Sequence, residues 1–157
     1  MEKPVSKPVS KPRCIYESNI KASREAVWQA LTTAEFTRQY WHSTGVESSW
    51  EEGSSIRFLH EDGRVAVDGQ ILKVVYPSLL SYTWHILWDE EMSIEAPSRV
   101  TFELEEVGDG TRLRMTHDDF AEGTQVVEML QEGWTDILSS MKSLLETGNP
   151  LPVGDSA

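Results

Sequence analysis

The sequence predicts an α+β domain in which a curved antiparallel sheet is wrapped around one long C-terminal helix. Short runs of alternating apolar and polar residues, separated by turns that contain glycine, occupy residues 46–117 and are typical of antiparallel strands. Residues 124–147 instead carry apolar side chains at helical spacing, which places them on one wide face. Because the sheet and the helix are each apolar on one side, we expect them to cover one another.

The N-terminal part of the domain predicts one strand followed by two short helices. Residues 14–21 alternate as a strand does, and Ser23 is a candidate N-cap for the first helix. Residues 32–33, both threonine, interrupt the helical spacing, and a second helix is expected at about 34–41. The apolar stripe of the first helix consists of Ala26, Val27, Ala30 and Leu31.

The middle of the chain predicts six further strands, which makes a sheet of about seven. Their expected ranges are 46–50, 55–61, 64–76, 79–87, 99–107 and 111–117. Asp62 and Gly63 form the strongest hairpin signal, because a type I′ turn requires positive φ at both central residues. Gly69 in the middle of a long strand predicts a bend or bulge. The acidic segment 88–97 predicts an irregular loop.

The long helix is expected to end at the Gly-Asn-Pro sequence of residues 148–150. At the other end of the chain, residues 1–12 read MEKPVSKPVSKP, and proline at every fourth position removes backbone donors and favours an extended chain. We therefore expect a disordered tail at 1–12, a single domain at 13–148 and a flexible tail at 149–157.

Length and composition indicate one domain with an acidic surface. The chain has 157 residues and a net charge of −12, and residues 1–13 hold four of its 14 basic residues. Nucleic acid and anionic membranes are therefore unsuitable partners for the domain. No apolar stretch approaches the length of about 20 residues needed to span a membrane. A single cysteine, Cys14, excludes an internal disulfide, and we expect a cytoplasmic protein.

Four segments of the chain, taken in order, are similar to one known family. Residues 20–31 (IKASREAVWQAL) resemble the opening of the helix-grip superfamily of START-like, polyketide-cyclase-like and Bet v 1-like domains, also called SRPBCC. Residues 69–84 (GQILKVVYPSLLSYTW), 110–117 (GTRLRMTH) and 132–141 resemble segments of the C-terminal domain family of the Hsp90 ATPase activator Aha1. The Trp-Trp-x-Pro motif of that family is Tyr-Trp-His-Ser here, at 40–43.

The resemblance implies the helix-grip fold and an apolar cavity between the sheet and the long helix. The residues support the same expectation, because one helix does not fill the concave side of a strongly bent sheet. We take as candidate ligand-binding residues those expected to face the space between the sheet and the helix. These candidates are Trp41, Phe58, His60, Val67, Tyr82, Trp84, Phe102, Met115, His117, Leu130, Trp134, Leu138 and Met141.

The two histidines in this set are the groups best suited to chemistry. His60 and His117 lie at inward positions on separate strands, where imidazole serves as a polar anchor or as a general acid or base. Asp118 and Asp119 do not form a carboxylate pair, since adjacent strand residues point to opposite faces. No HxH or HExxH spacing indicates a metal, and no nucleophile motif or cofactor-binding fingerprint is present.

Three functions follow from these features. The first is a module that binds a small hydrophobic or aromatic molecule between the sheet and the helix, without a cofactor. The second is an enzyme of the cyclase or hydratase type, with a pocket histidine or carboxylate as general base, as in some relatives of this fold. The third is a co-chaperone-like protein with an Hsp90-type partner, as the resemblance to Aha1 implies. We favour the first function over catalysis and over the co-chaperone role.

Overall fold

The computed structural model describes residues 12–121, 124 and 126–151, and it confirms the predicted α+β class. The expected order of one strand, two short helices, six strands and a long helix is also confirmed. The elements are β1 (Cys14–Ile20), α1 (Arg24–Thr32), α2 (Ala34–Tyr40), β2 (Gly45–Ser48), β3 (Ser55–Leu59), β4 (Val65–Val75), β5 (Leu79–Ile86), the 3₁₀ helix η1 (Met92–Ile94), β6 (Ser98–Val107), β7 (Gly110–Asp118) and α3 (Val127–Thr147).

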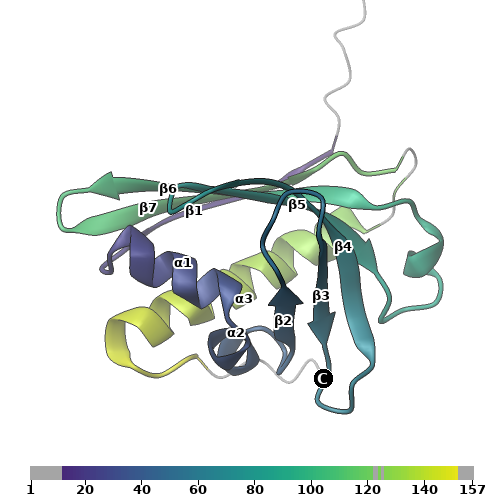
Figure 1. Cartoon of the computed structure of the whole chain (residues 1–157), viewed down its shortest axis with the longest axis horizontal. Coiled ribbons are helices and arrows are strands. Elements are labelled where there is room, and N and C mark those ends of the chain that lie inside the picture. Colours follow the sequence, from purple (N-terminus) through teal and green to yellow (C-terminus); the bar gives the residue numbers. More distant parts are fainter. Residues whose placement is uncertain (1–11, 122–123, 125, 152–157) are drawn as a thin grey trace, which may run out of the picture.

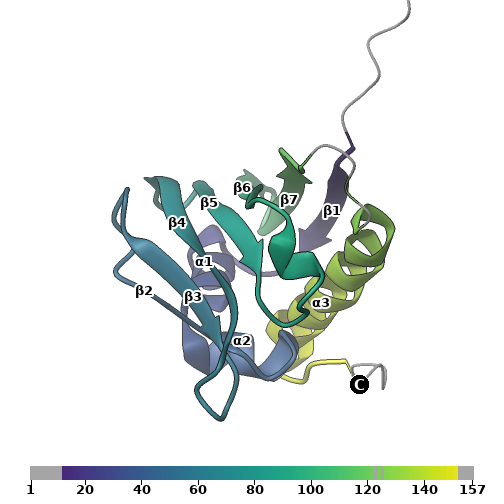
Figure 2. The ribbon, with the colours of Figure 1, turned by 90° about the vertical axis from the view of Figure 1, so that its right-hand side faces the viewer.

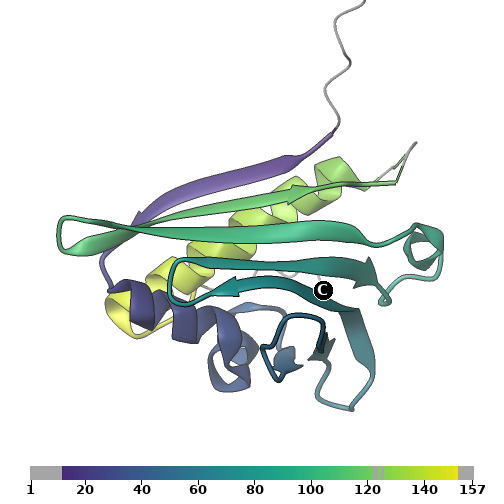
Figure 3. The same cartoon turned by 45° about the horizontal axis from the view of Figure 1, so that its top comes forward.

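The seven strands form one antiparallel sheet in the order β1-β7-β6-β5-β4-β3-β2 (Figure 3). Strands β2 to β7 follow one another as a meander, and β1 pairs with β7, so that Cys14 lies opposite His117. The sheet bends strongly, and all three α-helices lie on its concave side (Figure 2). In Figure 1, α1 and α3 lie side by side beneath the sheet, which makes a two-layer domain with the core between the layers.

The bend predicted at Gly69 coincides with an irregular stretch of β4. The register against β5 shifts between Ile71 and Lys73, and the amide of Gln70 donates to the Thr83 hydroxyl at 2.8 Å. A Cβ at Gly69 would lie 1.9 Å from the carbonyl oxygen of Thr83. Only glycine therefore permits the backbones of β4 and β5 to approach this closely.

The long helix α3 packs along β1 and forms hydrogen bonds with some of its outer backbone groups. The Gln131 side chain accepts from the amide of Ile15 at 3.3 Å and donates to the carbonyl of Ile15 at 3.2 Å, as a neighbouring strand would. Lys142 donates to the carbonyl of Asn19 at 2.9 Å. An unpaired strand edge is a template for aggregation, and the polar side chains of α3 cover part of this one.

Several boundaries differ from the sequence prediction for local reasons. The described part of α3 begins at Val127 rather than at residue 124, and Val126 is its N-cap. The loop expected at 88–97 contains η1, because the Asp89 carboxylate accepts from the amide of Met92 at 3.0 Å and starts a turn. The predicted tails at 1–12 and 149–157 lie mostly outside the described residues. None of the described helices has the length and hydropathy needed to cross a membrane.

Candidate functional site

The space between the sheet and α3 is filled by aromatic side chains. Trp41 lies at the centre of this cluster, with ring-centroid distances of 4.5 Å to Phe58, 6.0 Å to Trp84 and 5.4 Å to Trp134. Tyr82 and Phe102 extend it along β5 and β6. All of these rings are at most 4% exposed. The cavity expected at this position is therefore occupied by the protein's own side chains.

All of the candidate residues except His60 are buried in this core. The remaining members lie around the aromatic cluster, on β4, β7 and α3. They are Val67, Met115, His117, Leu130, Leu138 and Met141.

His60 does not belong to this buried core. Strand β3 ends at Leu59, so the alternation of sides does not continue to His60, and the pairing shift at this end of the strand leaves Ala66 of β4 without a partner on β3. Instead, the His60 amide donates to the Arg64 carbonyl at 2.8 Å and closes the hairpin. Its half-buried side chain lines an open surface hollow beside Arg38. The two histidines therefore do not converge on one site.

His117 is completely buried and has hydrogen bonds at both ring nitrogens. The indole N–H of Trp134 donates to Nδ1 at 3.0 Å, and the hydroxyl of Ser98 lies 2.6 Å from Nε2. Because an indole nitrogen is only a donor, Nδ1 must be the acceptor, and the proton of the neutral ring must be on Nε2. His117 then donates to Ser98, whose hydroxyl donates to the carbonyl of Trp84 at 3.3 Å.

This direction of the hydrogen bonds determines what His117 can do. A general base needs a free lone pair directed at the substrate, and the only lone pair of this ring in the ring plane accepts from Trp134. Burial lowers the pKa of His117 to about 3, and the nearby Asp118 carboxylate opposes only part of this shift. The ring is therefore neutral at physiological pH, and it acts as a connector between the sheet and α3.

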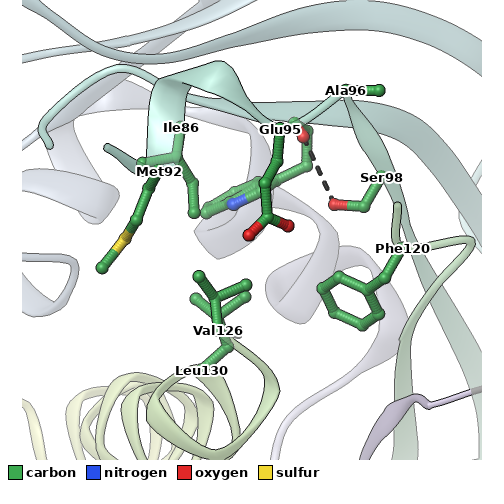
Figure 4. Close-up of a pocket in the computed structure, with 9 residues that line it drawn as sticks. Ile86, Met92, Glu95, Ala96, Ser98, Phe120, Val126 and Leu130 are labelled. Atoms are coloured by element: carbon green, nitrogen blue, oxygen red, sulfur yellow. Dashed lines mark hydrogen bonds between the residues drawn. The ribbon is translucent and has the colours of Figure 1, made fainter. Parts of the chain in front are cut away.

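A small hollow opens at the end of this network, where loop 88–97 approaches the start of α3. Its volume is about 10 Å³, which is space for at most one water-sized group. The lining is mainly apolar, with two polar side chains at its edge (Figure 4). The lining residues are Trp84, Ile86, Met92, Glu95, Ala96, Ser98, Phe120, Val126 and Leu130.

The indole nitrogen of Trp84, which lines this hollow, is buried without a hydrogen-bond partner in the described part of the chain. The Trp84 side chain is 4% exposed, and its indole Nε1 is the one buried side-chain nitrogen or oxygen without a hydrogen-bond partner among the described residues. Glu95 lies across the same hollow, half-buried, with its carboxylate directed toward the centre of the labelled side chains (Figure 4). The Thr124 hydroxyl donates to Glu95 Oε1 at 2.7 Å and fixes the carboxylate.

Sequence reasoning missed most of this hollow. Glu95 and Met92 lie in the segment that the sequence predicts as an irregular loop, and no periodic pattern places a loop side chain against a core. Ser98 had a usable signal, because it continues the inward series of Val100 and Phe102 by one more step. Asp118 forms a two-contact ion pair with Arg99, each contact 2.9 Å long. Asp119 follows the end of β7 with a positive φ, so strand alternation does not describe this pair of carboxylates.

The other titratable groups of the core are structural. Burial raises the pKa of the Cys14 thiol to about 11, and its sulfur lies 3.5 Å from the carbonyl of Val127. Burial also raises the pKa of Tyr40 and of Tyr82. Within residues 12–121, 124 and 126–151, no three His, Cys, Asp or Glu side chains gather closely enough to hold a metal ion.

The sequence matches the family described as "Activator of Hsp90 ATPase homolog 1-like protein" over residues 21–146, which is most of the chain. This chain belongs to that family. The predicted resemblance to Aha1 is thereby confirmed, and so is the helix-grip fold of the SRPBCC superfamily. No protein among curated sequences matches the chain.

Solved structures agree with this Aha1-like assignment. The solution structure of the Aha1 dimer from Colwellia psychrerythraea is 26% identical with a TM-score of 0.69, and the match covers 87% of this chain and 97% of that chain. A crystal structure of a Mesorhizobium loti protein is 25% identical with a TM-score of 0.71 and coverage of 85% and 96%. An Hsp90 activator from Plasmodium falciparum shares the fold, at 19% identity, a TM-score of 0.69 and coverage of 85% and 96%.

Proposed function

We propose that this Aha1-like domain binds a small hydrophobic or aromatic molecule at the hollow beside Trp84. The binding position differs from the one that sequence reasoning favours, because the deep space between sheet and α3 is filled. The observation that carries the proposal is the buried indole N–H of Trp84, which has no partner among the described residues. Such a group costs about 1–3 kcal/mol when it is left unsatisfied.

The surroundings of Trp84 suit the apolar part of such a ligand. Phe120 and Met92 are partly buried and pack against the core at the hollow, and Leu130 and Val126 form its floor on the α3 side. Apolar lining with a few convergent polar groups is the usual composition of a small-molecule site. The hollow admits one polar group of the ligand, and its apolar body then lies against these side chains.

Titration with small aromatic probes, followed by ¹H–¹⁵N NMR, tests this proposal. We expect a saturable shift of the Trp84 indole resonance, assigned by its loss in Trp84→Phe. Trp50 is half-buried and does not line the hollow, so Trp50→Phe is the matched control and is expected to bind normally. Neutral aromatic probes, flavone and 2-naphthol, that leave the Trp84 resonance unmoved up to their solubility limit would refute ligand binding here.

Family membership supports a second candidate, a co-chaperone role with an Hsp90-type partner in the cytoplasm. The match to the family extends over residues 21–146, and the Colwellia relative carries the name Aha1. A domain whose core is filled also suits a protein that binds its partner through its surface. The test is the ATPase rate of a cognate Hsp90 with and without the full chain, and an unchanged rate at tens of micromolar protein would contradict this role.

A further inference from the structure

The polar groups at the hollow specify the chemistry of the group that enters it. We infer that the ligand presents a hydroxyl group, as a phenol or an alcohol, to Trp84 and Glu95. This inference rests on the ligand binding proposed above and names the ligand class for the same site. It follows from three properties of the hollow, which are its size, its donor and its acceptor.

Size limits the polar part of the ligand to a single heavy atom. The volume of about 10 Å³ is near the minimum that holds one water molecule. The oxygen of a hydroxyl group has this size, whereas a carboxylate or an amide brings two polar atoms. The apolar remainder of the ligand must then lie at the mouth, against Met92 and Phe120.

The two polar side chains require opposite partners. The indole N–H of Trp84 only donates, and the carboxylate of Glu95 only accepts. A hydroxyl group satisfies both, because it accepts from Trp84 and donates to Glu95. A carbonyl or ether oxygen satisfies Trp84 alone, and an ammonium group satisfies Glu95 alone.

Charge excludes anions from the same position. A carboxylate ligand would place a second negative charge beside Glu95 in a partly buried site, where like charges repel strongly. The net charge of −12 on the whole chain adds to that repulsion. A neutral phenol or alcohol is therefore preferred over an aromatic acid of the same shape.

Three probes of one shape test the inference: 2-naphthol, naphthalene and 2-naphthoate, titrated calorimetrically into the full chain at pH 7. We expect 2-naphthol to bind about tenfold more tightly than naphthalene, the ratio that one or two net hydrogen bonds give. We expect 2-naphthoate to show no saturable binding. Equal affinity for 2-naphthol and naphthalene, or binding of 2-naphthoate as tight as that of 2-naphthol, overturns the inference while leaving the proposed function in place.

A variant isolates the contribution of Glu95. Glu95→Met removes the acceptor and keeps a side chain of similar length, so 2-naphthol is expected to lose most of its advantage and to bind this variant within about threefold of naphthalene. Glu91→Met, an exposed position on the same loop, is the matched control and is expected to keep the wild-type order. If Glu95→Met keeps the tenfold preference for 2-naphthol, Glu95 does not select the ligand and the inference fails. Failure of all three probes to bind the wild type overturns the proposed function and the inference together.

Discussion

Trp134 on α3 donates its indole proton to Nδ1 of His117 on β7, at 3.0 Å, in the fully buried interior. This bond joins the two layers of the domain through one polar contact inside an aromatic core. It fixes the tautomer of His117 and thereby directs the Nε2 proton toward Ser98. The chain of donors ends at the Trp84 carbonyl, so the same residue contributes to the core network and to the hollow.

The buried imidazole makes stability depend on pH in a defined window. The pKa of His117 is lowered to about 3 in the folded protein from an ordinary value of 6.5, with burial as the main cause. Between these values the unfolded chain binds a proton that the folded chain does not, so the free energy of unfolding rises with pH. Urea denaturation is expected to show a slope of up to about 1.4 kcal/mol per pH unit between pH 6 and pH 4.5.

The control for this slope is a variant that cannot titrate at position 117. His117→Gln removes the group, and we expect it to flatten the pH dependence in the same window. His85→Gln removes a histidine that lies 3.4 Å from the Asp68 carboxylate near the surface, and we expect it to retain most of the slope. A slope that is the same in wild type and His117→Gln would show that His117 is not the titrating group.

Two substitutions at His117 separate hydrogen bonding from packing. His117→Leu leaves the Trp134 N–H buried without an acceptor, which is expected to cost about 2 kcal/mol of unfolding free energy beyond any packing change. His117→Gln offers an amide oxygen as a replacement acceptor and is expected to be the more stable of the two. Chemical denaturation near pH 7, where the wild-type ring is neutral, measures the difference. Equal stability of the two variants would mean that the Trp134 bond contributes little.

Local pattern predicts the fold well because the strands are bounded by unambiguous turns. The Asp62-Gly63 turn and the glycine at 148 lie at element boundaries as expected, and both glycines have positive φ. The turn is not of type I′, because Asp62 does not have positive φ and the amide of Gly63 donates to the carbonyl of His60 at 2.9 Å. Alternation does not extend to His60 because β3 ends at Leu59 and His60 already belongs to the hairpin connection. The hollow was not predictable, since Glu95 reaches it from a loop without any period. Whether a cavity is open depends on packing, and here Trp41 occupies the space.

A pair of glycine substitutions tests why Gly69 is required. Gly69→Ala puts a Cβ 1.9 Å from the Thr83 carbonyl oxygen, so the β4 and β5 backbones must separate. We expect a loss of about 3 kcal/mol, equivalent to a fall of about 10 °C in melting temperature. The matched control is Gly133→Ala in α3, where an added Cβ meets nothing within 4 Å and the helix should gain about 0.5–1 kcal/mol. Scanning calorimetry of both variants gives the comparison, and a neutral Gly69→Ala would contradict the close approach.

Gln131 provides the last test, because its amide acts as a substitute strand for β1. The side chain makes both hydrogen bonds to Ile15, and its loss would expose a backbone donor and acceptor at the edge of the sheet. Gln131→Ala is expected to cost about 1 kcal/mol and to increase self-association, measured by denaturation and by light scattering at rising protein concentration. Gln131→Glu keeps the acceptor for the Ile15 amide but loses the donor, so it should be more stable than Gln131→Ala and less stable than the wild type. Repulsion between the new charge and the Ile15 carbonyl reduces this gain. Glu132→Ala, at the next and exposed position of α3, should alter neither measurement. If Gln131→Ala and Glu132→Ala behave alike, the edge of β1 is protected by the packing of α3 as a whole rather than by this amide.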